Sequence, residues 1–192
     1  MVKINNKIGG ILITFFPDEE LIKTINSIYK QVDLLYIIDN TPNEKENINL
    51  KKKLNKYQNI KLTKLGKNIG IAAAQNIGIK YFEQENFEYI LLSDQDTIFP
   101  NNYVENMLSS FKRMEKKDKK ISVMAPTFIN KNNNKKQGFV IFNGFFRKKI
   151  YPQKGLHSID QAINSGQIIK TAIFKNVGYF NEKLFIDWVD LE

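Results

Sequence analysis

The sequence contains no cysteine and only one histidine, His157, among its 192 residues. The absence of cysteine excludes disulfides, thiol nucleophiles and thiolate metal sites together, and it is compatible with a reducing compartment. One histidine cannot form a His-based metal site, and its polar neighbours predict that it faces solvent.

Long hydrophobic runs are also missing. No apolar stretch approaches the roughly 18 residues that a membrane-spanning helix needs, and the start Met-Val-Lys-Ile-Asn-Asn lacks the apolar centre of a signal peptide. With 42% hydrophobic and 26% charged residues, the composition is that of one globular domain that buries a core without cross-links. The sequence therefore predicts a soluble, cytoplasmic domain.

Acidic residues are in the minority, with 20 against 29 lysines and arginines, so the formal net charge is +9. A basic surface attracts phosphate, which raises the question of nucleic-acid binding. The lysines, however, fall in polar loops such as 51–53 and 131–136, and no helix-turn-helix, zinc pattern or aromatic stacking motif is present. We expect solvated lysines and no nucleic-acid partner; the alternative is peripheral contact with an anionic membrane surface or a lipid-phosphate acceptor.

Short apolar runs alternate with amphipathic stretches, which is typical of an α/β domain whose mainly parallel central sheet is flanked by helices. Pro17 predicts the first turn of a helix with an apolar stripe, and Pro100 lies near the start of another helix. Residues 127–157 lack a helical period and predict an irregular wall of a substrate cleft, with one or two short strands near 139–142. The predicted strands of the sheet are residues 8–16, 33–39, 59–65, 87–93 and 121–126.

Three of the first four predicted strands end in polar residues that a packed core would not favour. The endings are Asp39-Asn40-Thr41, Gly66-Lys67-Asn68 and Asp94-Gln95-Asp96. In open α/β sheets, ligands bind in the crevice beyond the carboxyl ends of the strands. The sequence therefore predicts a ligand site at this edge of the sheet.

Asp94 and Asp96 form an Asp-x-Asp motif, which is weak evidence alone because chance supplies one in roughly every two or three chains of this length. The structural alternative is a solvated turn that caps the next helix. At a sheet edge, two short carboxylates suit a hard divalent cation that keeps waters and binds substrate phosphates. The motif predicts Mg²⁺ or Mn²⁺ between Asp96 and a nucleoside diphosphate, with Asp94 at a ribose hydroxyl or a metal-bound water.

Two further groups fit a nucleotide pocket. The Asp39 carboxylate can accept the imide N–H of uracil or thymine, although an Asx turn explains the same residue. In the stretch 67–79, Asn68 predicts a helix N-cap and Gly70 predicts a close approach of the backbone to another group. A well-capped helix with a small-residue face is the alternative, but beside the Asp pair its N-terminus is expected to line the pocket.

Several stretches of the chain together resemble a known family, from about residue 8 to residue 192. They are "ITFFPDEE", "IIDNT", "NIGIAAAQNIGI", "LLSDQDT" and "INSGQIIK" with "VGYFNEKLFIDWVDLE". In this order and spacing they resemble the family 2 glycosyltransferases, which are inverting nucleotide-sugar enzymes of the GT-A fold with a Rossmann-like nucleotide-binding half. Within that family the chain is most similar to the bacterial rhamnosyltransferase-like subgroup.

The resemblance implies a role for each matching residue. In the family, the end of the first strand cradles the nucleotide, a carboxylate after the second strand binds the base, and the Asp-x-Asp motif holds the ribose and the metal-bound diphosphate. The residues implied to bind the nucleotide are Thr14, Phe15, Asp39, Asn68, Gly70, Asp94 and Gln95, and those implied to bind Mg²⁺ or Mn²⁺ are Asp94 and Asp96.

The acidic end of the chain matches the family motif that contains the catalytic base. That motif is often Glu-Asp, whereas this chain has Asp187-Trp188, so the base is either Asp187 or Asp190. Phe16 also departs from the family, because many members have Asn before the proline. Family members continue beyond this motif, so we expect a truncated single domain, with a nucleotide-binding part at about 1–126 and an acceptor-side part at about 127–192.

The implied reaction is the inverting, metal-dependent transfer of a sugar to a saccharide or lipid-linked acceptor in bacterial surface polysaccharide synthesis. The resemblance favours dTDP-rhamnose as the donor, with a UDP-sugar next. A truncated or inactive nucleotide-sugar-binding domain is the alternative. A sugar-phosphate nucleotidyltransferase is less favoured, because "TFFPDEE" is acidic where a triphosphate would need a glycine-rich loop. A glycosidase would need paired carboxylates at a set separation, which a sequence does not give.

Overall fold

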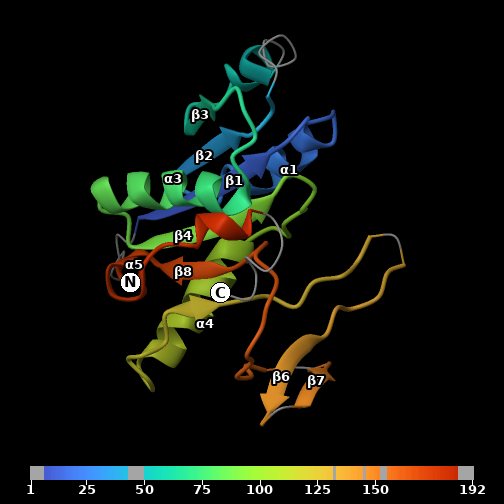
Figure 1. The fold of residues 1–192 in the computed structure, drawn as a ribbon, viewed down its shortest axis with the longest axis vertical. Helices are drawn as coiled ribbons and strands as arrows, with labels where there is room; N and C mark the ends of the chain where they lie inside the picture. Colours follow the sequence, from blue (N-terminus) through green and yellow to red (C-terminus); the bar gives the residue numbers. More distant parts are fainter. Residues whose placement is uncertain (1–6, 43–49, 132, 145, 152–154, 186–192) are drawn as a thin grey trace.

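The computed structural model describes residues 7–42, 50–131, 133–144, 146–151 and 155–185 (Figure 1). The strands are β1 (Ile8–Thr14), β2 (Leu34–Asp39), β3 (Ile60–Lys64), β4 (Tyr89–Asp94), β5 (Val123–Met124), β6 (Phe139–Asn143), β7 (Phe146–Ile150) and β8 (Ile168–Lys170). The helices are α1 (Leu21–Ile28), α3 (Ile71–Gln84), α4 (Tyr103–Glu115) and α5 (Phe174–Val177), with a helical stretch at 50–54 and 3₁₀ turns η1 (Thr171–Ile173) and η2 (Glu182–Leu184).

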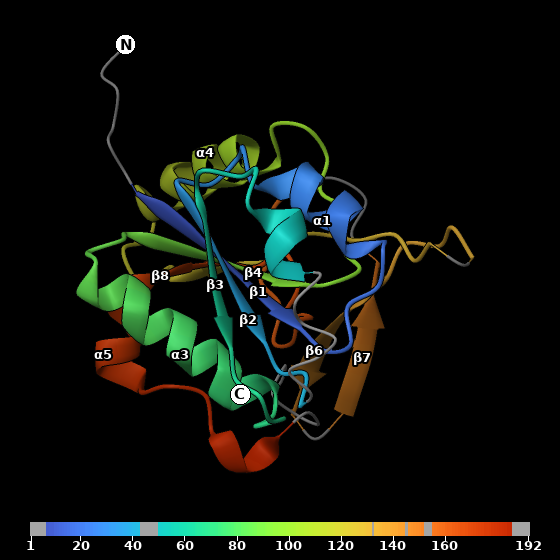
Figure 2. The same cartoon turned by 90° about the horizontal axis from the view of Figure 1, so that it is seen from above.

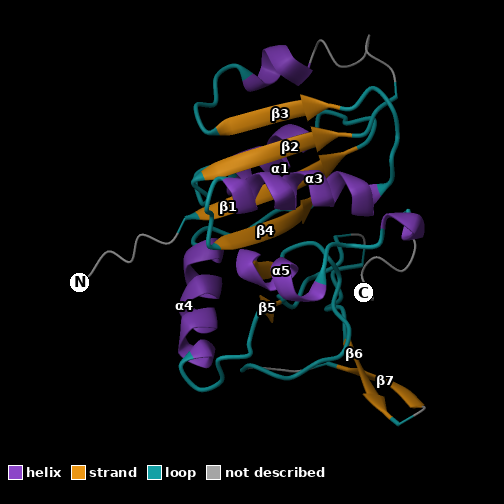
Figure 3. Ribbon diagram, turned by 60° about the vertical axis from the view of Figure 1, so that its left-hand side comes forward, coloured by secondary structure: helices purple, strands orange, loops and turns teal. Residues whose placement is uncertain are grey.

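The central sheet has the strand order β3-β2-β1-β4-β8-β5, and β6 and β7 form a separate hairpin (Figure 3). Strands β3, β2, β1 and β4 are parallel, which confirms the predicted mainly parallel α/β architecture. Strand β8 runs antiparallel to both of its neighbours, β4 and β5. The sheet is therefore completed by a strand from the last third of the chain, a pairing that local periodicity does not reveal.

Helices cover both faces of the sheet. In Figure 2, α1 and α4 lie on one face, and α3 and α5 lie on the other. Each face has its own apolar cluster, one built around Leu12, Ile25 and Phe111 and the other around Ile11 and Phe82. All seven residues of β1 are buried, as expected for a parallel strand covered on both sides.

Small residues bring α3 close to the sheet. A Cβ atom on Gly9 would lie 2.4 Å from the ring of Phe82, and a Cβ atom on Gly78 would lie 2.7 Å from Ile11 Cδ1. Both neighbours are fully buried, so neither has room to move aside. This close packing fixes where the N-terminus of α3 meets the ends of β1 and β2.

The chain between β1 and α1 differs from the prediction. Strand β1 ends at Thr14, and Phe16 adopts a positive φ of 45°, which ends the extended backbone. Helix α1 then begins at Leu21 instead of Pro17, because Asp18 Oδ1 accepts a hydrogen bond from the Glu20 N–H at 2.9 Å and holds a turn there. The predicted apolar stripe on α1, beginning with Leu21, is confirmed as buried.

Two further predicted strands are confirmed with changed boundaries. The strand predicted at 121–126 is reduced to Val123–Met124, and the strand predicted at 139–142 is β6. Within the described ranges, no helix is long and apolar enough to cross a membrane.

Candidate active site

The parallel register brings the polar strand endings into one row. Thr14 at the end of β1 pairs with Asp39 at the end of β2, and Ile13 pairs with Asp94 at the end of β4. Side chains from strands far apart in the sequence thus meet at one edge, where the sequence predicts a ligand site.

Asp39 is the most buried charged group of this edge, with an exposed fraction of 0%. Its Oδ1 accepts hydrogen bonds from Thr14 Oγ1 at 3.1 Å, from Thr41 Oγ1 at 2.6 Å and from the Thr41 N–H at 3.1 Å. The bond from the Thr41 N–H is the Asx turn that the sequence offers as an alternative role. Asp39 Oδ2, however, is buried without a hydrogen-bond partner in the described part of the chain. A buried carboxylate oxygen is costly unless it is paired, so Asp39 retains an acceptor for a ligand donor.

Gln95 fixes the loop that follows β1. Its side-chain Oε1 accepts from the Phe15 N–H at 2.9 Å, and its Nε2 donates to the Phe15 carbonyl at 3.2 Å. Thr41 Oγ1 accepts from the Phe16 N–H at 2.9 Å, which ties the same loop to β2. The Gln95 amide is therefore used to position Phe15, whose side chain is 43% exposed at the site; a direct contact of Gln95 with a nucleotide stays a prediction.

The start of α3 is built differently from the predicted N-cap. Asn68 Oδ1 accepts from the Gly70 N–H at 3.0 Å, whereas the cap position of α3 is Gly70 itself, with φ 85° and no side-chain cap. The N-cap prediction for Asn68 is therefore wrong, because its side chain closes a turn one step before the helix. Asn40 supports this turn, accepting from the Ile69 N–H at 3.3 Å and donating to the Gly70 carbonyl at 3.1 Å.

The predicted close approach at Gly70 is confirmed. A Cβ atom there would lie 2.8 Å from the Phe185 carbonyl oxygen, and that carbonyl accepts from the Ile71 N–H at 2.7 Å. Asn76, farther along α3, accepts from the Phe180 N–H at 3.0 Å and donates to the Phe180 carbonyl at 2.8 Å. The segment before the acidic motif is thus held along α3 beside the site. Asp187 and Asp190 lie outside the described residues.

Ser165, which sequence reasoning missed, fixes the loop after β4. Its Oγ accepts from the Asp94 N–H at 3.1 Å and lies 2.7 Å from Thr97 Oγ1. The next residue, Gly166, is held by the Tyr103 hydroxyl, which donates to its carbonyl at 2.5 Å. Burial raises the pKa of Tyr103, so this hydroxyl keeps its proton. The only sequence signal for Ser165 is its place in "INSGQ", just before β8.

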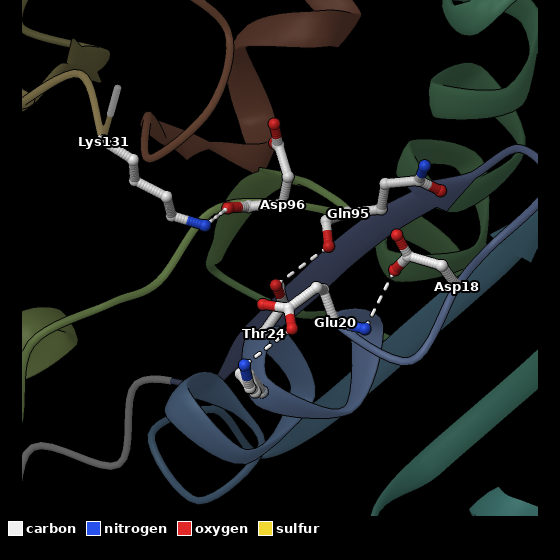
Figure 4. A network of polar contacts seen from close by, with 7 residues as sticks. Asp18, Glu20, Thr24, Gln95, Asp96 and Lys131 are labelled. Atoms are coloured by element: carbon white, nitrogen blue, oxygen red, sulfur yellow. Dashed lines mark hydrogen bonds and ion pairs between the residues drawn. The ribbon is translucent and has the colours of Figure 1, made fainter. Parts of the chain in front are cut away.

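Asp96 is exposed at the tip of the loop after β4. Figure 4 shows Lys131 reaching the Asp96 main-chain carbonyl oxygen with its Nζ, while the Asp96 carboxylate points away from that contact. On the other side of the loop, the Gln95 carbonyl accepts from Thr24 Oγ1 at 2.8 Å. Lys131, predicted as a solvated lysine, therefore places a cation beside the Asp-x-Asp motif.

The two aspartates alone do not form a closed metal site. The described ranges contain no group of three or more His, Asp or Glu side chains that could enclose a metal. An exposed carboxylate on a fixed loop instead fits a hard cation that takes its other ligands from water and substrate phosphates, as Mg²⁺ commonly does. Asn164, which precedes Ser165, is a second unpaired group after Asp39 Oδ2. Its Nδ2 is buried without a partner in the same ranges.

The family model described as glycosyl transferase family 2 matches residues 11–178, and the chain belongs to this family. Over 200 aligned residues the chain is 32% identical to the dTDP-rhamnosyl transferase RfbF of Shigella flexneri. The match covers 98% of this chain but 62% of that protein. The family predicted from the sequence, with its rhamnosyltransferase-like character, is thereby confirmed.

Solved structures support the fold. TarS 1–349 of S. aureus matches with a TM-score of 0.65 and 17% identity, covering 96% of this chain and 53% of that one. GalNAc-T7, solved with UDP, GalNAc and Mn²⁺, matches with a TM-score of 0.67 and 14% identity, covering 94% and 37%. These likenesses confirm the predicted GT-A architecture. The chain spans between about a third and two thirds of the length of these relatives.

Replacement of Gly70 by alanine should detach Phe185 from the start of α3. The new Cβ would strain a backbone at φ 85° and collide with the Phe185 carbonyl. We expect the Ile71 amide, which donates to that carbonyl, to lose its protection in hydrogen exchange by about tenfold or more. Gly66→Ala is the matched control, because Gly66 also has a positive φ but a Cβ there meets nothing within 4 Å. Equal loss of Ile71 protection in both variants would refute the role assigned to the Phe185 contact.

Proposed function

We propose that this chain is the donor-binding part of an inverting glycosyltransferase that transfers a sugar from a nucleoside diphosphate to a saccharide or lipid-linked acceptor in bacterial polysaccharide synthesis. Membership of family 2 supports the reaction class. The single observation that carries the site is the buried Asp39 carboxylate, which has one oxygen fully paired and the other unpaired.

The unpaired Asp39 oxygen favours a uracil or thymine base. Both bases present an imide N–H that an acceptor oxygen can bind, whereas cytosine offers no donor at that position. The Phe15 side chain, exposed on its fixed loop, gives the base an aromatic surface at the same edge. The 32% identity to a dTDP-rhamnosyl transferase supports thymine, and hence dTDP-rhamnose, as the first donor to test.

The diphosphate is proposed to lie over the loop after β4. Asp96, with Asp94, would hold Mg²⁺ or Mn²⁺ there, and the bound cation would neutralise charge that develops on the departing diphosphate. Lys131 Nζ, already at the Asp96 carbonyl, would add a positive charge beside the diphosphate oxygens. Relatives of the same fold solved with Mn²⁺ are consistent with this choice of ion.

Chemistry is assigned to the acidic end of the chain. In a single displacement, an acceptor hydroxyl attacks the anomeric carbon, its proton passes to a carboxylate, and the bond to the diphosphate breaks with its electron pair on the leaving oxygen. We propose Asp187 or Asp190 as that base. Support comes from the family motif that these residues match, and from Phe185, two residues before Asp187 in the sequence, whose carbonyl accepts from the Ile71 N–H at the start of α3.

The acceptor side and the location of the protein are also part of the proposal. The division into a nucleotide-binding part to about 126 and an acceptor-side part beyond it remains a prediction, since β8 of the second part belongs to the sheet. The protein is proposed to be cytoplasmic, and peripheral membrane contact is supported by the net charge of +9 and by Phe146, which is 80% exposed.

Binding of dTDP and UDP should depend on a divalent cation and on Asp96. In calorimetric titrations with Mn²⁺, we expect Asp96→Asn to weaken nucleotide binding by about tenfold or more, because it removes a charged oxygen ligand. Asp118→Asn, at an exposed aspartate between α4 and β5, removes the same charge elsewhere and should leave binding unchanged. Nucleotide binding by the wild type that ignores Mn²⁺, or equal effects of the two variants, would contradict the proposed diphosphate site.

Asp39 should decide which base is bound. In Asp39→Asn, either the amide group takes the Oδ2 position and cannot accept the imide N–H, or it takes the Oδ1 position and breaks the threonine contacts. We expect affinity for dTDP and UDP to fall about tenfold or more while the weaker binding of CDP changes little. An Asp39→Asn protein that keeps its preference for dTDP over CDP would show that Asp39 is only a structural turn residue.

A further inference from the structure

A cavity of about 520 Å³ lies outside the proposed nucleotide site, mostly in the region that the sequence predicts to be irregular. The β6–β7 hairpin forms one wall, residues near Phe128 and Gln137 form a second, and residues 161–163 close it. These walls are joined by backbone pairing, because Gln161 pairs with Val140 and the Gln137 N–H donates to the Phe128 carbonyl at 2.9 Å. The volume falls within the range of small-ligand sites.

Two cations line this cavity from the same strand. Arg147 and Lys149 are two residues apart on β7, so their side chains leave the same face of the hairpin and enter the cavity wall. Lys148, between them, belongs to the opposite face. The ion pairs found in the described ranges are Lys23–Glu20 and Lys170–Glu115, so neither cavity cation is neutralised by a carboxylate there.

The acidic residue next to the lining residue Gln161 is Asp160, and its carboxylate already accepts a hydrogen bond. Asp160 Oδ2 accepts from the Phe142 N–H at 2.6 Å and so holds the loop before Gln161 against β6. Lys149 Nζ lies 5.8 Å from the centre of the Tyr151 ring, a contact that leaves its charge in place. With two lining cations and one adjacent carboxylate, the cavity has a net positive charge, which favours an anionic ligand.

One of the lining residues also has an unused hydrogen-bond acceptor. Gln161 Oε1 is buried and has no partner in the described part of the chain, although the Gln161 main chain is fixed by Val140. Gln137 provides a second side-chain amide in the lining. A ligand that suits this wall carries hydroxyl donors as well as negative charge.

One short segment connects the cavity to the Asp-x-Asp loop. Phe128 lines the cavity, and Lys131, three residues later, contacts the Asp96 carbonyl. Figure 3 shows the β6–β7 hairpin on the side of the molecule toward which the parallel strands point. A ligand in the cavity would thus lie toward the carboxyl edge of the sheet, where the donor is proposed to bind.

We propose that this cavity binds the acceptor through a phosphoryl group attached to a sugar, with Arg147 and Lys149 on the phosphoryl oxygens and Gln161 Oε1 on a sugar hydroxyl. This proposal rests on the proposed function, because it assigns the acceptor class of the same enzyme. Arg147 is suited to the role, since its planar guanidinium forms two parallel bonds to phosphate oxygens.

The test is a titration of the whole chain with the 1-phosphates of glucose, galactose and N-acetylglucosamine, with dTDP and Mn²⁺ present in excess to occupy the donor site. At least one sugar phosphate should bind, and Arg147→Gln and Lys149→Gln should each weaken it about tenfold or more. Lys148→Gln is the matched control, with the same charge change on the same strand, and should leave binding unchanged. Gln161→Leu should weaken the sugar phosphate but not inorganic phosphate.

Several results would overturn this assignment. They are the absence of wild-type binding at millimolar concentration, equal effects of Lys148→Gln and Arg147→Gln, and binding of inorganic phosphate as tight as that of the sugar phosphate. The last result would identify a simple cationic patch. Binding of the sugar phosphate only when dTDP is left out would place it in the donor site instead. If dTDP itself fails to bind while the variants still separate sugar-phosphate binding, the donor proposal fails and the cavity assignment stands.

Discussion

The carboxyl edge of the sheet depends on one buried carboxylate. Asp39 draws Thr14 of β1 and Thr41 of the following loop onto a single oxygen, and Thr41 in turn holds the Phe16 amide. A buried negative charge persists only where hydrogen bonds compensate it. The same network therefore stabilises the loop geometry and leaves the second carboxylate oxygen for a ligand, so that folding and recognition use the same group.

Helix α3 connects the sheet to the chain segment near Phe185. Its small residues let it lie close to the sheet, with Gly78 against Ile11, so its N-terminus cannot shift independently of β1. The Ile71 N–H and the Asn76 side chain then hold the backbone at Phe185 and Phe180. The proposed donor site and the chain that leads to the proposed catalytic base are thus fixed to one rigid element.

Much of the fold follows from local pattern, whereas the supporting contacts do not. Apolar runs such as residues 34–39 predict buried strands, because a parallel strand must be apolar on both faces. Asp39 and Asp94 could be placed at the site because they end parallel strands whose ends share an edge. Gly70 could be placed there because it lies at the start of the helix that follows β3. The pairing of β8 with β4 and the contact of Ser165 could not be predicted, because they join parts of the chain about 70 to 80 residues apart, as the bond from the Asp94 N–H to Ser165 shows. The N-cap prediction for Asn68 failed because Asn40, a partner distant in sequence, holds a turn before the helix by accepting from the Ile69 N–H.

The central claim is that a nucleoside diphosphate and its metal lie at the carboxyl edge of the sheet. Amide NMR spectra recorded with dTDP and Mg²⁺, and again with paramagnetic Mn²⁺, would locate the ion directly. We expect selective broadening of the amides of Asp96, Thr97 and Ser165, with sharp signals at the far end of α4 near Lys116. Broadening centred on the β6–β7 hairpin, or none that depends on dTDP, would contradict it.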